Sequence, residues 1–262
     1  MGTIKIKTVK KEVKVDGKTL AYDLYQEDEL KKFDPAVLGL EDVGARSRQI
    51  GVLAAVFDLA GFTNFCCQVD PHLSMPSFLK EFLDWLFESI KSEFEYKRFS
   101  EGISLYADLP FFAKFMGDGV LFLWDVEDKN MKTICNIVIS LSNLCEQYRS
   151  DFAPKIKKHL SDTPKSLRCG VARGQVCSVG NGEDYVGPCI NIASRLQKLS
   201  NLGFCFSNRG IDFEEGMIEK SAKQYIVKRV SIRGVGKDEL VVVEESEFEK
   251  LSKRDKGVFK DV

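Results

Sequence analysis

Two aspartates have the surroundings that metal chemistry requires. Asp58 follows the apolar run 51–57, and Asp118 lies between Gly117 and Gly119. Each alone has an ordinary structural explanation, because Asp commonly starts a turn and Asp-Gly commonly closes a hairpin. If the two flanking strands are neighbours, however, both carboxylates reach one end of one sheet, where a cation would relieve their repulsion. Mg²⁺ or Mn²⁺, bound by one or two carboxylates and by substrate phosphates, is the usual solution.

The turn after Asp58 supplies a second feature. Gly61, Phe62 and Thr63 come soon after the apolar run and precede a predicted helix. Backbone N–H groups at such a turn can bind phosphate. Carboxylates beside a phosphate-binding turn predict a site for divalent ions and a polyphosphate.

The elements that must position these residues begin with a hairpin. Residues 4–25 alternate around Asp16-Gly17, which predicts two short strands, and the polar stretch 27–48 indicates a helix or a linker. The apolar run predicts a buried strand that stops at Asp58, with a tight turn at 59–63. A helix is predicted from about Ser74, with Pro76 in its first turn.

The rest of the chain mixes strands and helices. The segment 95–109 is irregular, and two apolar strands around 116–119 predict a second hairpin. One helical stripe consists of Ile134, Ile137, Leu141, Leu144 and Tyr148. The further predictions are strands at 167–173 and 175–180, a helix at 188–199, a strand at 203–206, a helix at 212–222, and strands at 225–233 and 239–245.

This order of elements predicts the α+β class. We expect an N-terminal extension over 1–48, a main domain over 49–246, and a charged, peripheral tail over 247–262.

Composition excludes several classes of protein. The 262 residues carry 38 basic and 39 acidic side chains, so neither nucleic acid nor an anionic membrane is expected as a partner. No uncharged run approaches the roughly 20 residues of a membrane helix, and the N-terminus lacks the pattern of a signal peptide. The 8 cysteines form no C-x-x-C pair, which favours reduced thiols and a cytoplasmic location. With 2 histidines, a zinc site is not expected.

Three segments resemble, in the same order, the signature blocks of class III nucleotidyl cyclases. They are FDLAGFT at 57–63, KFMGD at 114–118 and DYVGPCINIASR at 184–195, and the similarity spans about 50–245. The third block is the most specific, because it is long and its residues are widely spaced. The resemblance implies a ferredoxin-like βαββαβ core with extra strands, and a head-to-tail homodimer with shared active sites.

The same resemblance implies roles for single residues. Asp58, Leu59 and Asp118 would bind two ions of Mn²⁺ or Mg²⁺. Asn191 would orient the ribose, and Arg195 would stabilise charge on the α-phosphate. The remaining substrate contacts would come from Phe57, Gly61, Phe62, Thr63, Lys114, Asp184 and Arg233. Arg233 is a departure, because the family usually has Lys at this place, where it contacts the terminal phosphates. The positive charge is kept, but a planar guanidinium stands in place of a compact ammonium group.

The chemistry suits this set of residues. A 3′-hydroxyl attacks the α-phosphorus and expels pyrophosphate, while one ion lowers the pKa of the hydroxyl and the other neutralises the leaving oxygens. Taken singly, the later residues have ordinary explanations. Asn191 and Arg195 share a helix face that is usually solvated, and Lys114 and Arg233 suit a solvent-facing strand and a strand end.

The residue types fit more than one nucleotide base in the substrate. Lys114 is a donor and Asp184 an acceptor, and by the resemblance they would read the base from the partner chain. In the family this pair marks adenine, but its hydrogen-bond polarity also fits cytosine and uracil. Phe57, Phe111, Phe112 and Phe115 would narrow a pocket for a one-ring base, or they are plain core.

A narrower resemblance favours a pyrimidine. The blocks at 57–66, 70–73, 82–87 and 109–124 look like the stand-alone pyrimidine cyclases of bacterial anti-phage (Pycsar-type) systems. This implies cyclic UMP, or alternatively cyclic CMP, as a signal to a separate effector protein. UTP is the favoured substrate and CTP is possible. The alternatives are an adenylyl cyclase and a cyclase-like regulatory module without turnover.

Overall fold

The computed structural model describes residues 4–15, 18–68, 70–199, 201–212 and 223–262. The chain divides into two compact units. The N-terminal unit comprises Met1–Gln49 and Cys177–Val186, and the sheet unit comprises Ile50–Val176 and Gly187–Val262. This division differs from the predicted ranges, because residues 177–186 group with the N-terminal residues and 247–262 group with the larger unit.

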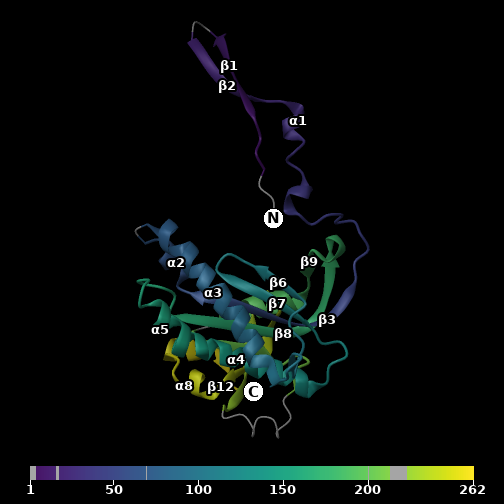
Figure 1. Cartoon of the computed structure of the whole chain (residues 1–262), viewed down its shortest axis with the longest axis vertical. Helices are drawn as coiled ribbons and strands as arrows, with labels where there is room; N and C mark the ends of the chain where they lie inside the picture. The colour runs from purple at the N-terminus through teal and green to yellow at the C-terminus, as the bar shows by residue number, and fades with distance from the viewer. Residues whose placement is uncertain (1–3, 16–17, 69, 200, 213–222) are drawn as a thin grey trace. The chain divides into compact units, whose positions relative to one another are not determined.

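The N-terminal unit starts with the predicted hairpin (Figure 1). Strands β1 (Thr8–Val15) and β2 (Lys18–Tyr25) pair in antiparallel register, while the Asp16-Gly17 turn lies outside the described residues. The short helices α1 (Glu27–Leu30) and η1 (Pro35–Leu38) follow. The unit is completed by η3 (Gly180–Gly182) and β9 (Asp184–Val186). The backbone N–H of Ser178 joins the two parts by donating to the carbonyl oxygen of Arg48 at 2.9 Å.

Within the described residues, the main sheet has nine strands. Eight follow the order β13-β11-β12-β10-β8-β3-β7-β6, and β9 pairs with β8. The eight strands are β3 (Gln49–Ala60), β6 (Phe112–Phe115), β7 (Gly119–Asp125), β8 (Ser166–Val179), β10 (Phe204–Ser207), β11 (Tyr225–Ile232), β12 (Gly236–Glu244) and β13 (Phe259–Lys260).

A βαββαβ unit forms the centre of this sheet. Its order along the chain is β3, α3 (Pro71–Phe94), β6, β7, α4 (Met131–Gln147) and β8. In space these strands have the order β8-β3-β7-β6, with β7 antiparallel to both of its neighbours. This is the ferredoxin-like arrangement. The predicted α+β class and its βαββαβ core are therefore confirmed.

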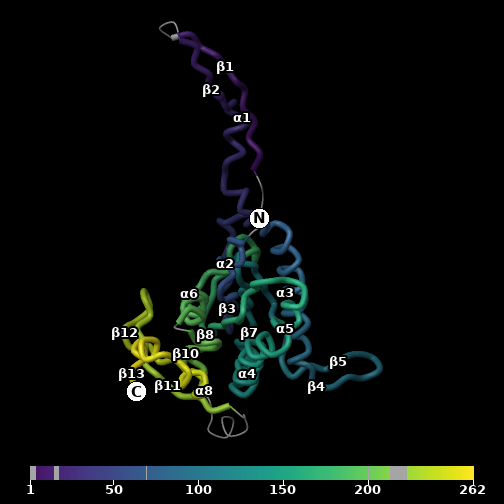
Figure 2. The backbone as a smooth tube through the Cα atoms, turned by 90° about the vertical axis from the view of Figure 1, so that its left-hand side faces the viewer, coloured from purple at the N-terminus to yellow at the C-terminus, as the bar shows by residue number. Residues whose placement is uncertain are grey.

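The two faces of β3 have different partners. Strand residues alternate between faces, and Leu53, Ala55, Phe57 and Leu59 join the hydrophobic core beneath α3 and α4. That core is rich in aromatic rings, among them Phe78, Phe82, Tyr148 and Phe152. Figure 2 shows α3 on one side of the strands and α6 (Pro188–Leu196) on the other.

Helix α6 approaches its side of the sheet closely at Gly170. A Cβ at this position would collide with the backbone of Ala193 and of Gln197. Glycine in β8 therefore allows the end of α6 to rest directly on the strand.

Several predicted boundaries were wrong at the start of the sheet unit. Strand β3 does not stop at Asp58, because the ladder continues with Leu59 N–H donating to the Asp118 carbonyl oxygen at 3.0 Å. Helix α3 begins at Pro71 rather than about Ser74. Pro71 therefore lies in the first turn of the helix, and Pro76 lies in its interior. The segment expected to be irregular contains a hairpin of β4 (Glu95–Arg98) and β5 (Ile103–Leu105).

Later elements also differ from expectation. The two strands predicted over 167–180 are one continuous strand, β8, and α6 ends at Leu196. Residues 213–222 of the helix predicted at 212–222 lie outside the described residues. In the predicted tail, the structure contains α8 (Glu245–Glu249), α9 (Lys253–Lys256) and β13, which pairs with β11. Buried Phe248 and Phe259 stack edge to face and attach this segment to the sheet.

The connection from α4 to β8 is helical, through η2 (Tyr148–Phe152) and α5 (Ala153–Ile156). The helix stripe expected from Ile134 to Tyr148 is confirmed, since all five of its residues are buried. Among the helices that the structure describes, none combines the length and the apolar character needed to cross a bilayer.

Candidate active site

Asp58 and Asp118 lie on paired strands. Asp58 in β3 is directly opposite Gly119 in β7, and Asp118 is the residue before that partner. The short turn after β6 is closed by Met116 N–H, which donates to the carbonyl oxygen of Gly119 at 2.8 Å. The prediction that the two strands are neighbours in one sheet is therefore confirmed.

Asp58 is a buried carboxylate in an ion pair. Its Oδ2 accepts hydrogen bonds from Nε of Arg168, at 3.1 Å, and from Nη2 of the same guanidinium. The Nζ of Lys198 lies 3.9 Å from Oδ1. Asp58 belongs to the face of β3 opposite the aromatic core, so its charge is balanced there by two cations.

Asp118 has different neighbours. It is half-buried, and it lies close enough to Cys66 of α2 (Phe62–Cys66) to affect that thiol. Burial raises the pKa of Cys66, and the neighbouring charges of Cys67 and Asp118 raise the pKa further. The two carboxylates thus lie on paired strands, while different charged or ionisable groups surround their side chains.

The donors present fit a hard divalent ion. Carboxylate and backbone oxygens are the ligands that Mg²⁺ takes in proteins, usually with substrate phosphates completing the set. No cluster of three or more His, Cys, Asp or Glu side chains suited to a metal occurs in the described part of the chain. The protein would accordingly supply Asp58, Asp118 and the backbone oxygen of Leu59, and a polyphosphate would supply further oxygens.

The turn after β3 begins at Gly61 and leads into the short helix α2. Gly61 has φ +87°, a conformation that favours glycine, and it precedes α2 without a side-chain cap. Thr63 is exposed, whereas the side chains of Phe57 and Phe62 are buried in the aromatic core. Burial therefore agrees with the core alternative given for Phe57, and Phe62, expected as a substrate contact, also packs in the core.

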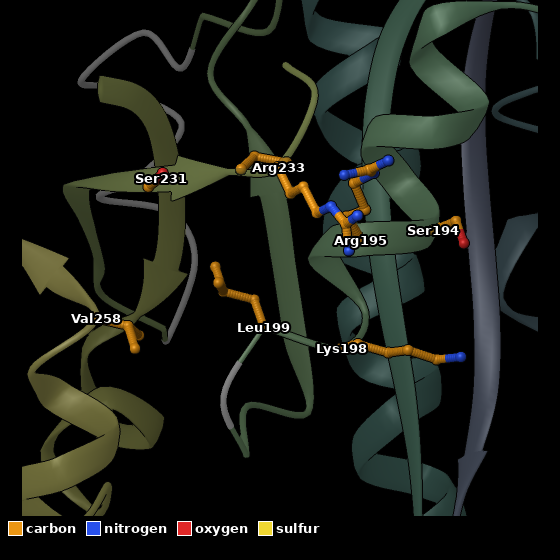
Figure 3. A pocket seen from close by; sticks show the side chains of 8 residues that line it. Ser194, Arg195, Lys198, Leu199, Ser231, Arg233 and Val258 are labelled. Carbon is orange, nitrogen blue, oxygen red and sulfur yellow. The ribbon is translucent and has the colours of Figure 1, made fainter. Parts of the chain in front are cut away.

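A basic cavity of about 610 Å³ lies between α6 and the end of β11. It is lined by Ser194, Arg195, Lys198, Leu199, Ser231, Ile232, Arg233 and Val258. Figure 3 shows the side chains of Arg195 and Arg233 extending toward each other. A Cβ at Gly234 would come within 3.6 Å of Arg195 Nη2, so this guanidinium lies against the turn that follows Arg233.

Both arginines are free to bind an anion. Arg195 and Arg233 are exposed, and neither pairs with a carboxylate among the residues that the structure describes. Two guanidinium groups held side by side repel each other unless an anion lies between them. Each presents a planar set of donors suited to phosphate. The cavity is therefore a candidate phosphate site.

Three predicted residues lie elsewhere. Asn191 is exposed on α6, one turn before Arg195. Lys114 is on edge strand β6, opposite Leu121 of β7. Asp184 begins β9 in the N-terminal unit, opposite Val179 of β8, and its carboxylate accepts from the N–H of Tyr185 at 2.9 Å.

Sequence reasoning missed Arg168 and Lys198, the two cations beside Asp58. Arg168 lies in an apolar strand, where a charged residue needs a partner, and this was a usable signal. The identity of that partner was not visible, because Asp58 is 110 residues away in the sequence. Lys198 follows Arg195 by three residues and looks like an ordinary end of a helix.

Comparisons with known proteins find matches among solved structures. No family model and no curated protein matches the chain. One similar solved structure is the catalytic core of a rhodopsin-guanylyl cyclase with converted specificity in complex with ATPαS, at 17% identity and TM-score 0.49, covering 76% of this chain and 98% of that one. Another is an adenylate/guanylate cyclase/hydrolase from Silicibacter pomeroyi, at 15% identity and TM-score 0.45, covering 75% of this chain and 96% of that one. Likeness at this level says nothing about substrate.

Proposed function

We propose that this chain is a nucleotidyl cyclase that converts UTP, or alternatively CTP, to the 3′,5′-cyclic monophosphate and pyrophosphate. The observation that carries the proposal is the meeting of Arg195 and Arg233 in one cavity. Both were assigned to phosphate contacts from separate segments of the sequence. Their convergence supports a site for the phosphates of a nucleoside triphosphate.

The residues have simple tasks in this reaction. The 3′-oxygen forms a bond to the α-phosphorus, the bond to pyrophosphate breaks, and the hydroxyl proton leaves to solvent. Divalent ions held by Asp58 and Asp118 would lower the pKa of the hydroxyl and neutralise the pyrophosphate oxygens. Arg195 stabilises charge on the α-phosphate, Arg233 binds the terminal phosphates, and Asn191 orients the ribose. Positioning and charge stabilisation do most of the work, so no histidine base is needed.

The active unit in this proposal is a homodimer with shared sites. Metal ligands of one chain act with Asn191 and Arg195 of the other, as the cyclase resemblance implies. Asp58→Ala and Asn191→Ala should each be inactive, and mixing the two variants should restore part of the activity through heterodimers. Mixtures without activity, from variants that fold and dimerise, would exclude shared sites.

The choice of base rests on the narrower resemblance. Lys114 and Asp184 provide one donor and one acceptor, which equally supports an adenylyl cyclase as the second candidate. Of the four aromatic residues expected near the base, Phe57 is buried in the core, while Phe111 and Phe115 are exposed. Of these, exposed Phe115 on edge strand β6 would narrow a pocket for a single-ring base.

A turnover assay tests the proposal directly. Purified chain is incubated with ATP, GTP, CTP or UTP and either Mn²⁺ or Mg²⁺, and the products are separated by chromatography. We expect cyclic UMP and pyrophosphate from UTP. Consumption of ATP with UTP and CTP left intact would establish the adenylyl alternative. No product from any nucleotide would establish a regulatory module without turnover.

The biological role in this proposal is bacterial anti-phage defence, in which the cyclic nucleotide activates a separate effector protein. Its support is the resemblance to the stand-alone pyrimidine cyclases. Expression of the chain together with such an effector protein should reduce phage plating, and the Asp58→Ala variant should not.

A further inference from the structure

Asp58, one of the carboxylates on which the proposed function depends, is already engaged within the chain. Its Oδ2 accepts from Nε of Arg168 at 3.1 Å and from Nη2, and its Oδ1 lies 3.9 Å from Nζ of Lys198. The Asp58 side chain is 4% exposed and that of Arg168 is 23% exposed. Two positive charges therefore face one buried carboxylate.

Asp118 differs from Asp58 in its burial and in its ion pairing. It is half-buried and forms no ion pair within the described ranges of the chain. Mg²⁺ and Mn²⁺ require direct bonds to carboxylate oxygens. Asp118 is available for such a bond, whereas an ion brought to Asp58 would meet the charges of Arg168 and Lys198 at close range.

We infer that Arg168 competes with the divalent ion for Asp58, so that an ion binding Oδ2 must displace the guanidinium from that oxygen. The inference rests on the proposed function for the identity of the ion. Arg168 is then a positioning residue, which holds Asp58 while the ion is absent and raises the ion concentration at which the site fills. Lys198 is the weaker competitor, because its side chain is 61% exposed and such pairs contribute little.

The experiment measures Mn²⁺ binding to the full chain without nucleotide, from the loss of the EPR signal of free Mn²⁺. Arg168→Met removes the charge and keeps most of the apolar length, so we expect Mn²⁺ affinity to rise about ten-fold or more. Arg168→Lys keeps the charge but loses the two-pronged contact, and it should give a smaller rise. Adding Asp58→Asn to Arg168→Met should remove the gain.

A matched control is Arg149→Met. It breaks another arginine–carboxylate pair, Arg149 with Glu247 at 2.7 Å, and it should leave Mn²⁺ binding unchanged. Equal or weaker Mn²⁺ binding by folded Arg168→Met overturns the inference, because Arg168 would then only hold Asp58 in place. If Arg168→Met does not fold, Arg168→Lys decides. A larger Mn²⁺-induced rise in Tm than in the wild type supports competition, and an equal or smaller rise overturns it.

Failure of the proposed function has a separate signature. If the wild type binds Mn²⁺ but converts none of the four nucleotides, the cyclase proposal fails while the Mn²⁺ comparison still decides the competition. If the wild type turns over nucleotide and Arg168→Met shows no gain in Mn²⁺ affinity, the competition fails alone. Absence of Mn²⁺ binding in both the wild type and Arg168→Met overturns the competition.

Discussion

Phe57 and Asp58 are neighbours in the chain, yet they face opposite sides of the same sheet. Phe57 is fully buried and stacks edge to face with Phe122, whose centroid is 6.0 Å away. Asp58 is almost as well buried, but its partners are the charged groups of Arg168 and Lys198. One side of β3 is thus an aromatic core. The other side also buries the apolar residues Val52, Ala54 and Val56, but at Asp58 it holds the ion pair with Arg168 and Lys198, which we call the charged side.

The comparison shows two different uses of burial. Apolar burial contributes directly to the free energy of folding. A buried ion pair contributes little, because the loss of hydration offsets most of the attraction between the charges. The ion pair of Asp58 therefore adds little stability for the area it covers. Its value is that it holds the Asp58 carboxylate in one position beside Arg168 and Lys198.

The largest expected effect comes from breaking the aromatic side. Phe82 contacts Phe78, Trp85, Tyr148 and Phe152, so Phe82→Ala leaves a cavity in the middle of the core. We expect a loss of about 3–5 kcal/mol in the free energy of unfolding, measured by urea denaturation. Phe115→Ala is the control, because Phe115 is 42% exposed and its removal should cost little. Equal losses from both variants would contradict the described core.

On the charged side, the main effect should be on turnover. Arg195→Ala removes one of the two guanidinium groups of the cavity, and we expect the rate to fall about 10²–10³-fold, as for an oxyanion-hole donor. Tm should change little, because the side chain is exposed. Arg254→Ala, an exposed arginine outside the cavity, is the control and should keep full activity. An Arg195→Ala enzyme as active as Arg254→Ala would remove Arg195 from the chemistry.

The aromatic side was far easier to predict than the charged side. Helical spacing identified the core stripe of α4, and apolar runs around a glycine turn identified β6 and β7, because both signals are local. The β4–β5 hairpin was missed, since the residues of β4, Glu95–Arg98, are mostly polar and lack the alternation of a half-buried strand. The break expected near Gly174 in β8 was wrong, because a glycine there serves to let Cys189 approach.

The charged side was predicted only in part. Asp58, Asp118, Arg195 and Arg233 were found through short motifs and through a resemblance, both of which are read along the chain. The partner of Asp58 was not found, because ion pairing across strands depends on register and on which face each residue occupies. The register between distant strands is not encoded in a local pattern.

A smaller effect should follow from separating α6 from the sheet. A Cβ at Gly170 would collide with the backbone of Ala193 and Gln197, so Gly170→Ala must displace the helix that carries Asn191 and Arg195. We expect a loss of about 1–3 kcal/mol in the free energy of unfolding, together with reduced turnover. Gly102→Ala is the matched control, because no atom lies within 4 Å of its added Cβ. If both variants behave alike, α6 does not rest on Gly170.

The smallest expected effect is on the labelling rate of Cys189, which reports how closely α6 packs on strand β8. Cys189 lies in the first turn of α6, with Sγ 3.8 Å from the carbonyl oxygen of Gln175, and burial raises its pKa to about 11. At pH 8 its thiolate fraction should be about 10²-fold below that of an ordinary thiol, because only the thiolate reacts. We therefore expect iodoacetamide to label Cys189 much more slowly than exposed Cys177, as measured by mass spectrometry of the peptides.

The same measurement links this helix to the comparison of the two sides. Gly170→Ala should speed the labelling of Cys189, because a lifted helix exposes the thiol and lowers its pKa, whereas Gly102→Ala should not. The aromatic-side variant Phe82→Ala should affect Cys189 only through global unfolding, which urea dependence would reveal. Fast labelling of Cys189 in the unaltered protein would mean that the first turn of α6 does not rest on β8 at Gln175. Lys198, which follows α6 and lies 3.9 Å from Asp58, would then be held less firmly beside that carboxylate.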